Sequence, residues 1–117
     1  MIQEKKDKKK SGIYIIKNKI NNKIYVGKAI DIYRRIKDHV TALNTKNKNE
    51  NPHLINAWYK YGRENFTYYV IEYLNNTDRL ILDVKLKERE LYWMNELNSL
   101  DKDKGYNLRL DSESGQI

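Results

Sequence analysis

Alternating apolar and polar residues predict a β-hairpin near the N-terminus. Between residues 12 and 28, isoleucine and valine alternate with tyrosine, glycine and lysine, which is the period of a strand with two different faces. Asn21 and Asn22 can supply the turn, because asparagine tolerates the positive φ values of two-residue hairpin loops. With this loop, Tyr14 pairs with Ala29. One face then carries Tyr14, Ile16, Tyr25 and Gly27, and the other carries Ile13, Ile15, Ile24 and Val26.

Three further segments have the spacing of amphipathic helices. Asp31 is a suitable N-cap for a helix that reaches about residue 44 and whose apolar stripe consists of Ile32, Ile36, Val40 and Leu43. A second, short helix is predicted to open at Asn51-Pro52 and to stop at Gly62. The longest helix follows a cap at residue 77 or 78 and extends to about residue 98.

The aromatic and β-branched run at residues 66–74 predicts a third strand, and residues 45–50 and 99–110 are expected to be loops. Together these elements predict an α/β domain. It contains a small, mainly antiparallel sheet of three strands, flanked by about three helices.

Composition limits the class of protein. A chain of 117 residues with no cysteine forms one domain without disulfides or thiolate metal sites, and an intracellular, cytoplasmic location is expected. No run approaches the roughly 18 apolar residues needed to cross a membrane. The net charge of +7 suggests a polyanionic partner, although a lysine-rich surface also serves solubility alone. Residues 1–10 are predicted to be a disordered basic tail, 11–110 the folded domain, and 111–117 a polar tail.

Glu90 is the most informative residue of the second half. On a helical wheel it falls within the apolar stripe of the longest helix, whereas Glu88 and Glu96 face solvent. A carboxylate on an apolar face costs several kcal/mol unless it is paired or binds a cation. Two interpretations follow from the helix alone: a buried salt bridge, or a metal ligand.

Arg35 and His39 lie one helical turn apart, at the rim of the buried face of the first helix. Each has an ordinary alternative, since arginine often extends along apolar surface and a single histidine often only packs. Beside two tyrosines, however, they supply what phosphodiester hydrolysis requires: a group that activates water and a guanidinium that holds phosphate oxygens.

Gly12-Ile13-Tyr14, followed ten residues later by Tyr25-Val26-Gly27, resembles the paired tripeptides of the GIY-YIG endonucleases, with valine in place of the commoner isoleucine. The resemblance extends to residue 107 and is closest to phage and intron-encoded homing enzymes, although Lys28-Ala29 is similar to the excision-repair branch. It implies that Tyr14 or Tyr25 helps to activate water, and Tyr14 is preferred, with His39 relaying its proton. Nearby positive charge from Lys28 and Arg35 would have to lower the pKa of this phenol.

The resemblance also implies the remaining roles. Arg35 would bind the scissile phosphate, and Glu90 would hold a single Mg²⁺ or Mn²⁺. Gly27 would allow close backbone approach, and Lys28 and Arg34 would contact the substrate. Asn107 would lie near the site and orient side chains or a phosphate of the substrate. Some homing members carry a second histidine after the first helix. His53 does not align with it, so its role stays open.

The predicted substrate is DNA, contacted mostly through its phosphates. Homing relatives append a separate DNA-binding module, so the chain is expected to be either a free-standing nuclease or a fragment that needs such a domain or a partner protein. An inactive DNA-binding module of the same fold, and a basic domain that contacts protein or RNA, are the competing hypotheses. Cutting pattern and oligomeric state are not predicted.

Overall fold

The computed structural model describes residues 1–108, so the predicted polar tail at 111–117 lies outside the described residues. The strands are β1 (Ser11–Asn18), β2 (Ile24–Ala29) and β3 (Phe66–Leu74). The helices are α1 (Ile32–Asn44), α2 (Pro52–Tyr61) and α3 (Arg79–Glu96), with short 3₁₀ turns η1 (Lys5–Asp7) and η2 (Arg63–Asn65). Asp31, Asn51 and Asp78 cap the three α-helices with their side chains, because each accepts a backbone N–H that the first turn leaves unpaired.

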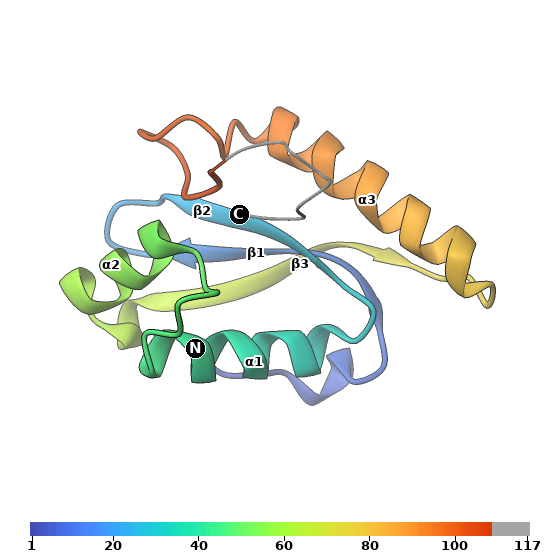
Figure 1. Cartoon of the computed structure of the whole chain (residues 1–117), viewed down its shortest axis with the longest axis horizontal. Coiled ribbons are helices and arrows are strands. Elements are labelled where there is room, and N and C mark those ends of the chain that lie inside the picture. Colours follow the sequence, from blue (N-terminus) through green and yellow to red (C-terminus); the bar gives the residue numbers. More distant parts are fainter. Residues whose placement is uncertain (109–117) are drawn as a thin grey trace.

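All three strands belong to one antiparallel sheet in the order β2-β1-β3. Figure 1 shows α3 over one face of this sheet and α1 and α2 over the other. The predicted fold class is therefore confirmed. β1 is the central strand, so it contributes side chains to both layers.

The hairpin register differs from the prediction by two residues. Tyr14 pairs with Gly27, and the loop occupies residues 19–23. The backbone N–H of Asn18 donates to the carbonyl of Lys23, and the Asn18 side chain accepts from the N–H of Ile20. Asn22 takes a positive φ of 65° within this longer loop. Because a shift of two residues preserves the alternation of a strand, the predicted division of residues between the two faces still holds.

Each face of the sheet has its own hydrophobic core. Ile13 and Val26 pack with Leu82, Leu86 and Met94 of α3. On the opposite face, a larger cluster joins β1, β3, α1 and α2 and includes Tyr14, Ile36, Leu54, Trp58 and Phe66. Tyr14 is thus part of a core as well as a candidate for chemistry.

The N-terminal segment is not the disordered tail that its lysines predict. Lys5–Asp7 form a 3₁₀ turn, and the side chain of Asp7 is fully buried. Its two carboxylate oxygens accept hydrogen bonds from the hydroxyls of Tyr68 and Tyr73, each over 2.6 Å. These two bonds to β3 tie the segment to the sheet, which a composition-based prediction cannot detect.

In residues 1–108, no helix has the length and apolar character that a membrane crossing demands.

Candidate active site

Tyr14 and His39 are joined by a hydrogen bond inside the layer between β1 and α1. The Tyr14 oxygen lies 2.7 Å from Nε2 of His39, and the ring of Tyr25 lies edge-on to the same imidazole at 5.5 Å between centroids. The expectation that His39 sits at the rim of α1 was wrong, since the residue is fully buried whereas Val40 is only partly so. The hydrogen bond to Tyr14 explains how a polar ring is accommodated there.

Glu50 is a member of this site that the sequence did not single out. Its Oε1 lies 2.9 Å from Nδ1 of His39, and its Oε2 accepts the backbone N–H of Asn51 over 3.0 Å. Glu50 ends a polar segment that was correctly predicted to be a loop, and nothing in its spacing distinguishes it from a solvated residue. The signal that could have found it is its position directly before the helix cap Asn51.

Burial, rather than positive charge, dominates the acidity of the two phenols. It raises the pKa of Tyr14 well above its ordinary value, and raises the pKa of Tyr25 to about 12, although the Arg35 cation partly opposes both shifts. Arg35 thus lowers both tyrosine pKa values, as expected, but burial outweighs it, and Lys28 is not among the charges that act on either phenol. With its pKa raised in this way, the Tyr14 phenol keeps its proton at neutral pH.

Arg35 is half-buried and lies close to both phenols. Interaction with the Tyr14 oxygen is the largest of the effects that raise the pKa of Arg35, so this guanidinium stays cationic. Arg34, its neighbour, is exposed. The two arginines therefore offer one cation inside the site and one at its mouth.

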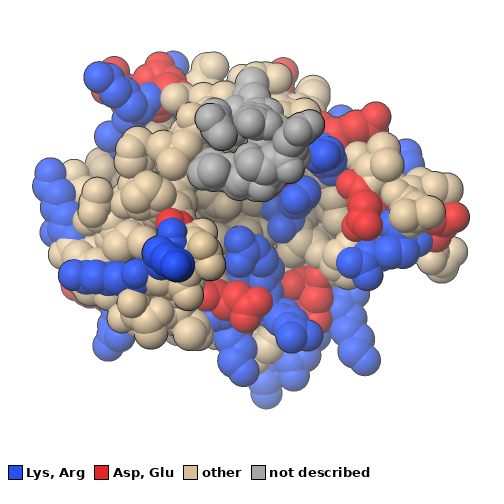
Figure 2. All heavy atoms as spheres, viewed as in Figure 1, with Lys and Arg blue, Asp and Glu red and all other residues tan. Residues whose placement is uncertain are grey.

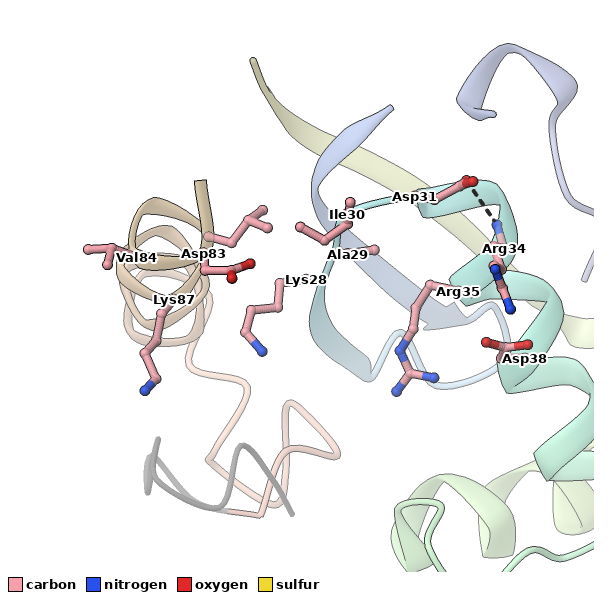
Figure 3. Close-up of a pocket in the computed structure, with 11 residues that line it drawn as sticks. Lys28, Ala29, Ile30, Asp31, Arg34, Arg35, Asp38, Asp83, Val84 and Lys87 are labelled. Atoms are coloured by element: carbon pink, nitrogen blue, oxygen red, sulfur yellow. Dashed lines mark hydrogen bonds between the residues drawn. The ribbon is translucent and has the colours of Figure 1, made fainter. Parts of the chain in front are cut away.

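A hollow of about 660 Å³ lies between α1, β2 and α3. Lys28, Arg34, Arg35 and Lys87 line it, together with Asp31, Asp38 and Asp83. In Figure 3, Lys28 of β2 lies between α1 and α3. Its side chain and that of Lys87 extend in the same general direction as the side chain of Arg35. On the face of the molecule drawn in Figure 2, Lys and Arg side chains gather in the middle, with acidic side chains among them. Lys87 is a second residue that the sequence did not single out.

Glu90 reaches the same region from α3. It is half-buried, and burial raises the pKa of its carboxyl, while Lys28, Arg35 and Lys87 act in the opposite direction. Among the described residues, no salt bridge satisfies this carboxylate, which removes the simplest structural explanation for it within residues 1–108. Glu88 and Glu96 are exposed, as predicted.

A divalent cation fits Glu90 by its chemistry. Mg²⁺ prefers oxygen ligands and commonly binds through one or two carboxylates plus waters and substrate phosphates. Within residues 1–108, no cluster of three or more His, Cys, Asp or Glu side chains could hold a metal ion. A carboxylate of this kind is suited to an ion that takes its other ligands from water and phosphate.

Asn107 pairs with the backbone of β2, and its role toward side chains of the site or the substrate stays a prediction. Its Oδ1 accepts the backbone N–H of Val26 over 2.8 Å, and its Nδ2 donates to the carbonyl of the same residue over 3.1 Å. The carboxamide thus pairs with β2 as a neighbouring strand would. His53 is exposed near the start of α2, and no hydrogen bond within the described residues gives it a role.

Residues 10–107 match the GIY-YIG catalytic domain. The chain belongs to this family. Within the matched range, Tyr14 and Tyr25 lie against His39, Arg35 lies near both phenols, and Glu90 of α3 is within electrostatic reach of Arg35 and Lys28.

Among GIY-YIG relatives, the chain is 40% identical over 99 residues to intron-associated endonuclease 1 of Enterobacteria phage T4. It is 34% identical over 91 residues to a probable intron-encoded endonuclease 1 of Neurospora crassa. These matches cover 85% and 78% of this chain, but only 37% and 28% of the relatives, so the chain spans about a third of their length.

Two solved structures share the fold. The catalytic domain of homing endonuclease I-TevI superposes with a TM-score of 0.67 over 85% of this chain and 98% of that one. A mutant of the same catalytic domain gives 0.71 over 86% and 94%, and both are 37% identical in sequence.

Proposed function

We propose that this chain is the catalytic domain of a divalent-metal-dependent endonuclease that hydrolyses phosphodiester bonds of DNA. One observation carries the proposal: the Tyr14–His39 hydrogen bond lies beside the cationic Arg35 and within the electrostatic reach of Glu90. A phenol with a ready proton acceptor, a guanidinium and a carboxylate are the groups that phosphoryl transfer by water demands.

The proposed reaction begins with proton transfer along Tyr14 and His39. A water molecule gives a proton to the Tyr14 oxygen while the phenolic proton moves to Nε2 of His39. The water oxygen forms a bond to phosphorus as the bond to the leaving oxygen breaks, and solvent protonates the leaving group. Because the pKa of Tyr14 is raised, this concerted exchange avoids a free phenolate at neutral pH.

Arg35 and Glu90 would act on the phosphate. The Arg35 guanidinium is suited to bind two phosphate oxygens and to neutralise the charge that develops on them. Glu90 would hold Mg²⁺ or Mn²⁺, which when bound supplies further stabilisation of that charge. Tyr14 is fully buried, so its hydroxyl has to become accessible when the substrate binds.

Substrate binding would rest on the cations of the hollow. Lys28, Arg34 and Lys87 offer positive charge to the phosphates flanking the scissile bond. They are not arranged along a helix that would enter a groove of DNA and contact base edges. The relatives are longer than this chain, so the part of them outside the match is large enough for a separate DNA-binding domain. On its own, this domain should cleave with little sequence preference and bind weakly, with strong dependence on salt.

The test is a plasmid-relaxation assay at low salt with Mg²⁺, Mn²⁺ or EDTA. Wild type should nick the plasmid only with metal, and Tyr14→Phe, His39→Gln and Glu90→Gln should each lower the rate by about 100-fold or more. Glu88→Gln is the matched control, since this carboxylate is exposed on the same helix and should leave the rate unchanged.

An inactive DNA-binding module of the same fold is the second candidate, and the complete burial of Tyr14 is the observation that favours it. Binding of a DNA duplex without cleavage under any metal would support the module and sink the endonuclease.

A further inference from the structure

A chain of three hydrogen bonds crosses the buried layer behind Tyr14. It runs from the Tyr14 oxygen to Nε2 of His39 over 2.7 Å, and from Nδ1 of His39 to Oε1 of Glu50 over 2.9 Å. The remaining oxygen of Glu50 accepts the backbone N–H of Asn51 over 3.0 Å. His39 is fully buried and Glu50 is only 9% exposed, so these contacts are largely shielded from solvent.

The carboxylate determines which imidazole nitrogen carries the proton. An ionised carboxylate only accepts hydrogen bonds, so Nδ1 must be the donor, and Nε2 is left with a lone pair. That lone pair faces the Tyr14 hydroxyl, which can then only be the donor of the 2.7 Å bond. The Glu50 carboxylate therefore determines that the proton moves from Tyr14 to His39.

We propose that Glu50 is a positioning residue of the reaction: it holds His39 in the Nδ1–H tautomer and stabilises the imidazolium formed when the Tyr14 proton reaches Nε2. This inference rests on the proposed function for its catalytic meaning, but the tautomer does not depend on cleavage. In the transfer, the O–H bond of Tyr14 breaks, the Nε2–H bond forms, and the new positive charge lies next to the Glu50 carboxylate. Solvent removes the proton after turnover.

Two further observations support this role. Burial alone would favour the neutral form of Glu50, yet hydrogen bonds from His39 and from the Asn51 backbone outweigh it, and the net pKa is lowered. Burial lowers the pKa of His39, so the imidazole is neutral and able to accept a proton at neutral pH. Other titratable groups also face the imidazole: Tyr14 from β1, Tyr25 from β2, and Arg35 and Asp38 from α1 itself.

Glu50 is also held in place from behind. Asn51 caps α2 by accepting the N–H of Leu54, and its Nδ2 donates to the carbonyl of Tyr106. The orienting carboxylate is therefore fixed by a helix start and by the C-terminal segment. Such support is what a positioning group needs.

The experiment is histidine side-chain NMR on the intact chain, which contains only two histidines. His53→Gln assigns the signals, because this exposed residue lies outside the site. Long-range ¹H–¹⁵N spectra should show wild-type His39 as the Nδ1–H tautomer. Glu50→Ala should shift His39 toward a mixture of tautomers, and Glu50→Gln should lower the pKa of His39. Glu64→Gln, an exposed carboxylate, should change neither.

Single-turnover cleavage as a function of pH then separates positioning from mere packing. Glu50→Gln should lower the plateau rate by about 10- to 100-fold and move the acid limb of the profile to lower pH, with Glu50→Asp recovering part of the rate. A uniform loss of rate with an unmoved acid limb would overturn the inference, as would the Nε2–H tautomer in wild type. If Glu50→Gln does not fold, the wild-type tautomer and Glu50→Asp decide. Absence of cleavage in wild type would instead remove the proposed function and leave the tautomer result standing.

Discussion

The hydroxyl of Tyr14 occupies the space that a side chain on residue 27 would need. A Cβ added to Gly27 would collide with this oxygen and with Cζ of the same ring. Tyr14 and Gly27 are also direct partners across β1 and β2. The second glycine of the paired motif thus has a packing explanation: it makes room for the tyrosine of the first tripeptide.

Gly27→Ala should therefore damage both stability and activity. The added methyl must push the Tyr14 ring away from His39, and overpacking of this kind costs about 1–3 kcal/mol. A displacement of about 1 Å at a reacting group can lower the rate by about 100-fold. Urea denaturation and plasmid nicking measure the two effects. In a Tyr14→Ala background the same substitution should cost much less stability, and an equal cost in both backgrounds would contradict the steric explanation.

The burial of His39 predicts a pH dependence of stability. Burial lowers its pKa in the folded state, whereas the unfolded chain takes up a proton near pH 6.5. Below about pH 6.5 the unfolded state thus binds more protons, and the free energy of unfolding should fall as the pH drops through this window. His39→Gln should flatten the slope between pH 7 and about 5, and His53→Gln should not. Equal slopes in all three proteins would show that His39 titrates normally.

Glu90 should weaken the fold when no metal is present. Burial raises its pKa, so the ionised form is disfavoured in the folded state at neutral pH. This penalty declines as the pH falls through the raised value and is gone below the ordinary value of 4.5. Glu90→Gln should then increase the free energy of unfolding at pH 7 in EDTA, by less than about 1 kcal/mol.

Magnesium should reverse this order of stability, so that wild type becomes more stable than Glu90→Gln. At a free concentration ten times its Kd, Mg²⁺ should stabilise wild type by about 1.4 kcal/mol and Glu90→Gln by much less. Glu88→Gln should respond as wild type does. Equal stabilisation of all three proteins by Mg²⁺ would place the ion elsewhere.

Asp7 should anchor the N-terminal segment. Asp7→Ala removes the acceptor of two phenolic hydrogen bonds and leaves the buried Tyr68 hydroxyl without it, at a cost of about 1–3 kcal/mol. Trypsin should cleave among residues 5–10 much faster in this variant than in wild type or Lys6→Ala. Rapid cleavage of wild type at the same sites would restore the prediction of a disordered tail.

The elements were predictable because each carries a strong local signal. Asp31, Asn51 with Pro52, and Asp78 mark three helix starts, and the run 66–74 has the composition of a strand and is one. The predicted register of the hairpin was wrong by two residues, but the assignment of residues to its two faces was correct, because strand alternation repeats every two residues. The expectation that Tyr14, Arg35 and His39 lie near one another rested on the resemblance to the family, and the hydrogen bond between Tyr14 and His39 agrees with it.

What the sequence missed depends on contacts between distant segments. Glu50 meets His39 only because residues 45–50 fold back across α1, and Asp7 meets Tyr68 across 61 positions. The pairing of Asn107 with Val26 spans 81 positions and leaves no local pattern, so the sequence did not predict it. The raised pKa of Tyr14 likewise follows from its place in a core, which motif spacing does not reveal.

The pairing of Asn107 with Val26 has a consequence for how this sheet avoids self-association. β2 is an edge strand, yet the outward backbone groups of its first half are occupied: Ile24 bonds with Lys104 and Tyr106, and Val26 bonds with the Asn107 carboxamide. An open edge invites pairing with another chain. A chain shortened to end before Gly105 would expose this edge, and light scattering should then detect aggregates of the truncated protein. Residues 105–107 thus protect the solubility of the sheet next to which the active site is built.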